Sequence, residues 1–295
     1  MIRLFRLASL ALLLAGCAAT PPVEPPAAAA PRAVRIALAL GGGAARGFAH
    51  VGVIKALEAQ GIHPDIVVGT SAGSVVGALY AAGYGGFELQ RLAFGMDDST
   101  VSDWSLPDRG IIKGEALQNY VNAALGNRPI EKLGKMLAIV ATDLQSGEAV
   151  VFRTGNTGMA VRASSSVPGI FQPARINGRE FVDGGLVSPV PVKIARELGA
   201  DVVIAVDISS QPQFGKTDSS LAVLLQTFNI MAHTIASHEL PQADVVLHPR
   251  IGGISGTDFQ GKHLAILEGE RAVAESLPAL RAKIAAAAAS PVKDR

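Results

Sequence analysis

Short apolar runs alternate with amphipathic segments along most of the chain. Four of the runs are continuously apolar, as strands covered on both faces of a parallel sheet are, and three shorter runs are further strand candidates. This alternation predicts one three-layer α/β/α domain over residues 34–288, with a mainly parallel central sheet and no internal repeat. The predicted strands are 34–40, 65–69, 136–144, 148–153, 179–185, 201–208 and 243–249, and the predicted helices are 47–60, 72–83, 114–125, 190–198, 219–238 and 266–288.

The first residues follow a different pattern. Arg3 and Arg6 precede an apolar run over 7–15, which matches a secretory signal peptide and is too short to cross a bilayer core as a mature helix. The run ends in "LAGC", which resembles the bacterial lipobox, at which Cys17 is lipidated and the preceding segment is removed. The alternative is a cysteine that happens to end an ordinary signal peptide. The match at four positions favours lipidation.

Cleavage before Cys17 predicts a signal peptide over residues 1–16 and a lipidated cysteine with a Pro/Ala-rich tether over 17–33. Proline favours extended polyproline geometry, so the tether is expected to be semi-rigid. In lipoproteins of this kind, Ala18 in place of an aspartate implies anchoring to the bacterial outer membrane, facing the periplasm. The Ala-rich end of the last helix is expected to fray into a tail over 289–295.

Composition narrows the possible functions. The formal net charge is +1, charged residues make up 17% of the chain, and no basic stripe is interleaved with aromatic residues, so nucleic acid is not an expected partner. The only cysteine is Cys17, so an intramolecular disulfide is excluded.

A glycine-rich turn, "GGGAARG", follows the first predicted strand and opens a helix. The dinucleotide fingerprint places a third glycine where this chain has Arg46, and a P-loop places a lysine where it has Phe48, so both nucleotide interpretations are weakened. What remains is a turn whose N–H groups, at the positive end of a helix, can stabilise a developing oxyanion. That interpretation predicts a nucleophile nearby.

The next strand-to-helix turn supplies a candidate nucleophile. Ser71 lies in Gly69-Thr70-Ser71-Ala72-Gly73, a G-x-S-x-G pattern in the strand–turn–helix context that a nucleophile elbow requires. The alternative is a glycine-rich turn in which Ser71 only caps the helix.

A serine hydroxyl needs a base, and two candidates are present. Asp183 ends a short predicted strand, and Gly184 and Gly185 leave room for another backbone or a substrate, although an ordinary Asp-Gly-Gly turn has the same sequence. His248 ends a later strand in the order that an α/β-hydrolase would use. The elbow, however, follows only the second strand, which argues against that fold. The other histidines show no spacing that favours catalysis or metal binding.

Four blocks together, "GGGAARG" (41–47), "GTSAG" (69–73), "ASSSVPGIFQP" (163–173) and "DGG" (183–185), resemble the patatin-like phospholipase family in order and spacing. The resemblance runs from about residue 34 to 208. It implies the patatin-like α/β/α fold and a Ser-Asp dyad with Ser71 as nucleophile and Asp183 as base. It also implies an oxyanion hole formed by the loop that holds Gly41, Gly42, Gly43 and Arg46. The third block is expected to line the wall beside the nucleophile, although a helix end broken by proline and glycine fits it equally well.

The resemblance implies a serine acyl-ester hydrolase acting on phospholipids or other lipids, without a cofactor or metal. Its proposed chemistry has Gly42 and Gly43 N–H groups holding the oxyanion. The expected partners are a lipid substrate and, through Cys17, a membrane. The alternative is a non-catalytic periplasmic lipoprotein that binds an acyl or anionic ligand in the same pocket. Residues 95–113 and 209–220 are the loops that we expect to cover Ser71 if a lid exists.

Overall fold

A computed structural model of the chain describes residues 33–96, 103, 109–212, 217–256 and 258–290. The predicted signal peptide, Cys17, nearly all of the tether and the last five residues lie outside the described residues, as do parts of both loops suspected of forming a lid. The described residues belong to one compact unit.

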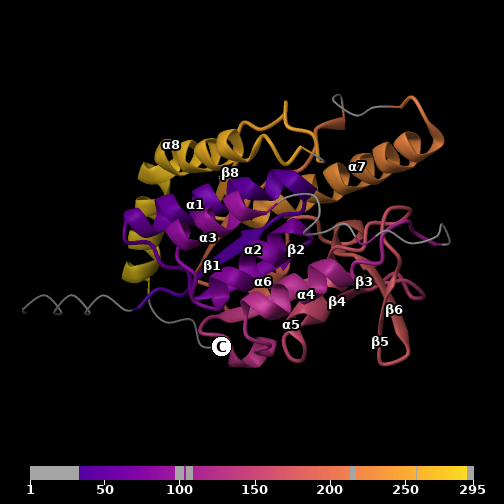
Figure 1. Ribbon diagram of the computed structural model, residues 1–295. Coiled ribbons are helices and arrows are strands. Elements are labelled where there is room, and N and C mark those ends of the chain that lie inside the picture. Colours follow the sequence, from indigo (N-terminus) through magenta and orange to yellow (C-terminus); the bar gives the residue numbers. More distant parts are fainter. Residues whose placement is uncertain (1–32, 97–102, 104–108, 213–216, 257, 291–295) are drawn as a thin grey trace, which may run out of the picture. The chain divides into compact units, whose positions relative to one another are not determined.

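The described part of the chain contains one eight-stranded sheet, whose strands run in the order β5-β6-β3-β2-β1-β7-β8, with β4 paired to β3 (Figure 1). β3, β2, β1, β7 and β8 are parallel to one another, whereas β4, β5 and β6 are antiparallel additions at the β3 side. The strands are β1 (Ile36–Leu40), β2 (Ile66–Thr70), β3 (Met136–Asp143), β4 (Ala149–Phe152), β5 (Ala174–Ile176), β6 (Arg179–Asp183), β7 (Val202–Val206) and β8 (Val245–Leu247).

Helices cover both faces of the sheet, because its central strands carry apolar side chains on both sides. Side chains of α1, α2, α3, α4 and α8 pack on one face with Leu38 and Ile204, and side chains of α6 and the end of α7 pack on the other with Ala39 and Val203. The result is the expected three-layer α/β/α fold. The helices are α1 (Phe48–Ala59), α2 (Ala72–Ala81), α3 (Gly86–Gly95), α4 (Glu115–Ala124), α5 (Thr157–Ser164), α6 (Val192–Glu197), α7 (Ser220–Glu239) and α8 (Lys262–Ala289), with short 3-10 turns η1 (Ala44–Gly47), η3 (Ile130–Lys132), η4 (Gly184–Leu186) and η6 (Leu240–Gln242).

The two predicted turns lie at one edge of this sheet. Gly41 follows β1, Ser71 follows β2, and β1 and β2 are adjacent and parallel, with Leu40 paired to Gly69. The carboxyl ends of parallel strands are where α/β folds place their ligands. Asp183 ends β6, pairs with Ala141 of β3, and thereby comes from the other side of β3 to the same edge.

Candidate active site

Ser71 occupies a strained turn between β2 and α2. Its φ is 53° and its ψ is −123°, a conformation that a non-glycine residue seldom adopts and that commonly marks a functional position. The flanking glycines are required by close backbone contact. A Cβ at Gly69 would lie 2.5 Å from the Gly73 carbonyl oxygen, and a Cβ at Gly73 would lie 2.1 Å from that of Leu40. The strand–turn–helix geometry expected at Ser71 is therefore present, and the turn stands at the N-terminal end of α2.

The end of α5 holds both Ser71 and Asp183 in place. The Ser71 backbone N–H donates to Oγ of Ser164 at 2.8 Å, and the Ser164 hydroxyl in turn donates to the carbonyl of Val140. Two residues later, the carbonyl of Ser166 accepts the backbone N–H of Asp183 at 3.0 Å. The serine-rich block thus connects the two predicted catalytic residues through backbone contacts.

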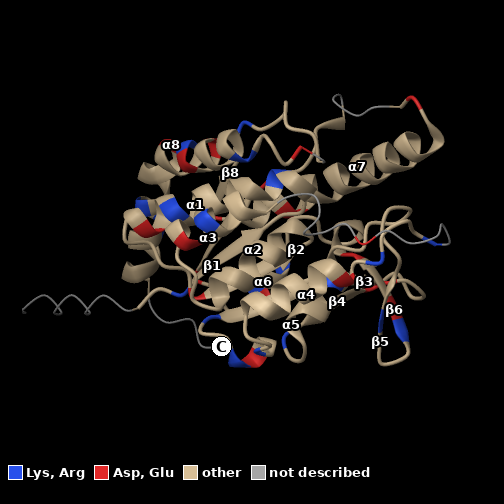
Figure 2. Cartoon of the chain, viewed as in Figure 1, with Lys and Arg blue, Asp and Glu red and all other residues tan. Residues whose placement is uncertain are grey.

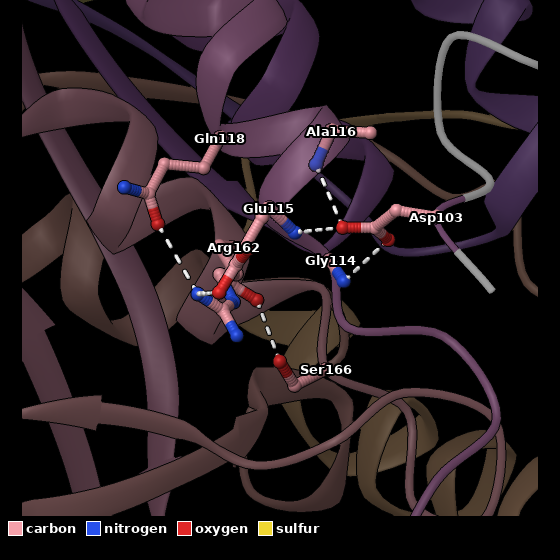
Figure 3. Close-up of polar contacts among 7 residues, drawn as sticks. All are labelled: Asp103, Gly114, Glu115, Ala116, Gln118, Arg162 and Ser166. Carbon is pink, nitrogen blue, oxygen red and sulfur yellow. Dashed lines mark hydrogen bonds and ion pairs between the residues drawn. The ribbon is translucent and has the colours of Figure 1, made fainter. Parts of the chain in front are cut away.

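The neighbouring helix α4 braces α5 from outside (Figure 3). Asp103 caps the start of α4 by accepting the N–H groups of Gly114, Glu115 and Ala116 at 2.6–3.0 Å. From α5, Arg162 reaches Gln118 at 3.4 Å and Glu115 at 3.8 Å, and its carbonyl accepts the Ser166 hydroxyl at 2.8 Å. These contacts fix the helix end that carries the serine-rich block.

Asp183 is buried, with 1% of its surface exposed. Its Oδ1 accepts the Gly185 N–H at 2.7 Å, whereas its Oδ2 is buried and has no hydrogen-bond partner of ordinary geometry among the described residues. Burial raises the pKa of Asp183 to about 6, and hydrogen bonding from the Ser71 hydroxyl and the Gly185 N–H opposes that rise. The Ser71 hydroxyl is therefore near enough to act on the pKa without a well-formed bond, as is common for a serine and its base before substrate binds.

The turn after Asp183 is pressed against the nucleophile strand. A Cβ at Gly184 would lie 2.3 Å from the Val140 carbonyl oxygen and 3.1 Å from Cγ2 of Thr70, the residue before Ser71. The Asp183 carbonyl also accepts the Thr142 hydroxyl at 2.8 Å. Gly184 is thus needed for close approach.

The glycine-rich loop runs beside Ser71, but two of its N–H groups are already used. Gly41 donates to the Val206 carbonyl at 3.1 Å and Gly42 to the Pro189 carbonyl at 3.0 Å. The Gly42 N–H therefore differs from the free oxyanion donor that the sequence suggested. Its Cα faces the nucleophile instead, because a Cβ there would lie 3.2 Å from Cβ of Ser71. Gly43 N–H has no hydrogen-bond partner within the described residues.

Arg46 and His50 stand behind the loop. Nε2 of His50 lies 2.8 Å from the Gly41 carbonyl, so this nitrogen carries the proton and donates it, while Nδ1 is buried without a partner in the described part. Burial lowers the pKa of His50 to about 4, which keeps the ring neutral. Burial also lowers the pKa of Arg46, against the opposing effect of Asp207, and Nε of Arg46 has no partner among the described residues. His50 holds the loop rather than facing Ser71.

His248 pairs with Asp207 rather than with the serine. Nδ1 of His248 lies 3.5 Å from Oδ2 of Asp207, and this contact raises the pKa of His248. These residues follow β8 and β7, and β8 is three positions from β2 in the sheet, a separation of about 14 Å at ordinary strand spacing. The structure therefore brings Ser71 together with Asp183 and not with His248.

A second, half-buried carboxyl, that of Glu239, links α7 to the turn after Asp183. Ser188 donates its hydroxyl to Oε1 of Glu239 at 2.6 Å, and the Ser188 carbonyl accepts the Thr70 hydroxyl at 2.8 Å. Burial raises the pKa of Glu239 to about 7. The last turn of α7 is thus linked to the strand that carries the nucleophile.

Sequence reasoning missed several of these supports. The hydrogen bonds that Ser164, Ser166 and Thr142 make to Ser71 and Asp183 join residues far apart in the sequence, and no local pattern encodes them. The serine run in "ASSSVPGIFQP" was the only signal for two of these residues. Three or more His, Cys, Asp or Glu side chains placed to hold a metal ion are not found in the part of the chain that the structure describes.

The fold and the turn at Ser71 define an α/β/α protein with a serine held on a strained strand-to-helix turn. The chain belongs to the patatin-like phospholipase family, whose model matches residues 38–196.

Relatives of known sequence agree with this assignment. An uncharacterized NTE family protein of Mycobacterium tuberculosis is 35% identical over 206 residues, covering 69% of this chain and 57% of the relative. Patatin-like phospholipase domain-containing protein 6 of Homo sapiens is 36% identical over 186 residues, covering 60% of this chain and 14% of the relative. The chain thus spans only part of the length of these curated relatives.

Solved structures show the same fold at low identity. VipD from Legionella pneumophila superposes with a TM-score of 0.58 and 14% identity, covering 83% of this chain and 67% of that protein. ExoU of Pseudomonas aeruginosa, in complex with SpcU, superposes with a TM-score of 0.51 and 15% identity, covering 86% of this chain and 53% of the other.

Proposed function

We propose that the protein is a serine hydrolase of lipid acyl esters, with Ser71 as nucleophile and Asp183 as its base. The observation that carries the proposal is the buried Oδ2 of Asp183, which has no hydrogen-bond partner of ordinary geometry in the described part. The Ser71 hydroxyl lies close enough to this carboxyl to lower its pKa. A family whose name describes phospholipases, and a human relative named for a phospholipase domain, support the lipid substrate class.

The reaction proceeds in two steps. Asp183 accepts the hydroxyl proton as Ser71 Oγ forms a bond to the ester carbonyl carbon, and the proton then passes to the leaving alkoxide as the ester C–O bond breaks. Water next attacks the carbonyl carbon of the acyl-serine and gives its proton to Asp183; the bond between that carbon and Ser71 Oγ then breaks, the proton passes back to Oγ, and the acid is released. A base with a pKa of about 6 is stronger than an ordinary aspartate and is still ionised at neutral pH.

Oxyanion stabilisation falls to the N–H groups that are free to donate. Gly43 N–H is a candidate, and the N-terminal end of α2 beside Ser71 adds favourable electrostatics for negative charge. The hydrogen bonds of Gly41 and Gly42 to the Val206 and Pro189 carbonyls hold this loop in shape.

The test is labelling by a fluorophosphonate probe together with hydrolysis of p-nitrophenyl butyrate. Ser71→Ala is expected to abolish both, and Asp183→Asn to lower both by at least about 100-fold. Ser146 and Asp218 are exposed, so Ser146→Ala and Asp218→Asn are matched controls and should change neither labelling nor hydrolysis. Full activity in Ser71→Ala or Asp183→Asn would overturn the dyad, and absence of labelling in the unmutated chain would favour a non-catalytic acyl-binding lipoprotein.

We also propose lipid anchoring at Cys17 to the outer membrane, facing the periplasm. The motif "LAGC" and the preceding apolar run support it. Mass spectrometry of the protein from fractionated bacterial membranes tests it: a diacylglyceryl modification on Cys17, absent in Cys17→Ser, is expected. An unmodified Cys17 would contradict the proposal.

A further inference from the structure

The outer face of α7 is apolar and exposed. α7 is 20 residues long, yet of its side chains only Ala232 and Ala236, near its C-terminal end, are fully buried. Large apolar side chains on this helix are 40–49% exposed. They gather on one element, whereas the apolar side chains on a protein surface are normally scattered singly. We call this set the α7 face: Leu221, Val223, Leu224, Ile230 and Met231.

The α7 face offers almost nothing to water. Residues 219–238 include no Asp, Glu, Lys or Arg, and Figure 2 shows the helix uncoloured along this stretch. Three exposed hydroxyls bond within the helix: Thr227 to the Val223 carbonyl at 2.9 Å, Thr234 to that of Ile230 at 3.0 Å, and Ser237 to that of Thr234 at 2.7 Å. Serine and threonine do this in membrane helices, because no water is available there.

Two side chains of the same helix also reach the segments around Ser71 and Asp183. A Cβ at Gly169, in the serine-rich block, would lie 3.1 Å from Cδ2 of Leu224, and a Cβ at Gly185 would lie 2.9 Å from Cζ of Phe228. At its C-terminal end α7 is held by the contact between Glu239 and Ser188. The apolar face is therefore continuous with the surroundings of Asp183.

We propose that the α7 face docks on a lipid bilayer and lies in its apolar boundary, so that the site at Ser71 and Asp183 meets lipid esters at the membrane surface. This inference rests on the proposed function for the identity of the substrate. Among the described residues no helix is long and apolar enough to span a membrane, so we place α7 in the plane of the interface.

The lack of charge favours lipid over protein as the occupant. A protein partner is recognised through a polar rim with about one hydrogen bond per 100–200 Å² of interface. The α7 face has no charged side chain, and the hydroxyls of Thr227, Thr234 and Ser237 already bond within the helix. Such a surface gives up few hydrogen bonds to water when it moves into hydrocarbon.

The first test places a polarity-sensitive NBD label on the full-length chain carrying Cys17→Ser, through Ile230→Cys or, as control, Leu264→Cys. Leu264 is exposed on α8, with Lys262, Glu268 and Glu270 on the same helix. With neutral phosphatidylcholine vesicles, the label at 230 should brighten about threefold or more and be quenched by doxyl lipids, as burial in hydrocarbon requires. The label at 264 should not respond. The N-terminal segment is common to both proteins.

No vesicle response at position 230 would overturn the proposal. Brightening that instead grows with protein concentration in the absence of vesicles would also overturn it, and would identify a second copy of the chain as the occupant.

The second test separates docking from catalysis. Ile230→Asp with Met231→Asp should lower hydrolysis of vesicle phospholipid by about tenfold or more and leave p-nitrophenyl butyrate hydrolysis within about twofold, because charge opposes insertion but does not touch the site. Leu264→Asp with Leu267→Asp is the matched control. Equal loss on both substrates, or on neither, would contradict docking. If the unmutated chain hydrolyses neither ester, the proposed function fails, and the label at 230 still decides docking.

Discussion

The hydroxyl of Ser164 accepts the backbone N–H of Ser71 at 2.8 Å, across 93 positions of sequence. Two residues along, the Ser166 carbonyl accepts the N–H of Asp183. One helix end therefore sets the spacing between the proposed nucleophile and its base. The geometry of the proposed dyad is fixed by hydrogen bonds to the backbone N–H groups of Ser71 and Asp183, and the acceptors lie outside both residues' own sequence motifs.

Ser164→Ala should therefore damage both stability and activity. It leaves the buried Ser71 N–H without an acceptor, a loss of about 1–3 kcal/mol in the free energy of unfolding, and it loosens the strained turn. Urea unfolding and p-nitrophenyl butyrate kinetics measure the two effects. Ser165→Ala is the control, because the buried Ser165 hydroxyl has no hydrogen-bond partner in the described residues and its removal should be neutral. Equal behaviour of the two variants would refute the role of Ser164.

Gly42→Ala should act on the nucleophile through space. The added methyl would lie 3.2 Å from Cβ of Ser71, tighter than ordinary contact, so either the serine or the loop must shift. A displacement of this size near the reacting atoms is expected to lower kcat/KM by about 10- to 100-fold. Gly95→Ala serves as control, because a Cβ there meets nothing within 4 Å. Unchanged kcat/KM in Gly42→Ala would show that the loop does not border the reacting serine.

The raised pKa of Asp183 has consequences for both activity and stability. The base must be ionised, so kcat/KM should fall as pH drops through about 6. A carboxyl with a pKa above its usual 3.8 binds its proton more tightly in the folded state than in the unfolded state. The free energy of unfolding therefore falls as pH rises from about 4 to 6 and stays at the lower value above pH 6.

Asp183→Asn should consequently be more stable than the unmutated protein at pH 8, by up to about 3 kcal/mol, and nearly equal to it at pH 4. Urea unfolding at the two pH values measures the difference. A variant that is less stable at pH 8 would show that the buried carboxylate is favourably solvated, contrary to the pKa shift.

His248→Ala should retain activity within about twofold. The imidazole pairs with Asp207 and stands about three strand spacings from the nucleophile strand, too far to accept the Ser71 proton. Kinetics with p-nitrophenyl butyrate and a thermal unfolding curve decide the matter. Loss of activity in a folded His248→Ala protein would restore the triad interpretation.

The sequence predicted the elements with a clear apolar pattern and missed β5, α3 and α5. All seven predicted strands and six predicted helices correspond to elements of the structure, because buried parallel strands leave continuous apolar runs. β5 (ARI) has an arginine between its two apolar residues, α5 (TGMAVRAS) mixes small and polar residues with its apolar ones, and α3 begins and ends in glycine, so none of the three gives a clear apolar pattern.

The site divides in the same way. The turns at Ser71 and Asp183 are local, so the spacing of glycines predicted them, and the structure brings them together. The hydrogen bonds from Gly41 and Gly42 to carbonyls on distant segments, and the burial that raises the pKa of Asp183, depend on tertiary contacts. The motif indicated which loop lies beside the serine but not which of its N–H groups are free.

The unpaired Oδ2 of Asp183 is also an opportunity for inhibitor design. A buried acceptor without a donor carries a desolvation cost that a bound molecule can relieve. A reversible inhibitor that binds beside Ser71 and directs a hydroxyl or amide N–H at that oxygen should bind more tightly than its methyl-capped analogue. The expected difference is about 5- to 150-fold in Kd, the equivalent of about 1–3 kcal/mol. Potency at this site should follow hydrogen-bond donors more than added hydrophobic bulk.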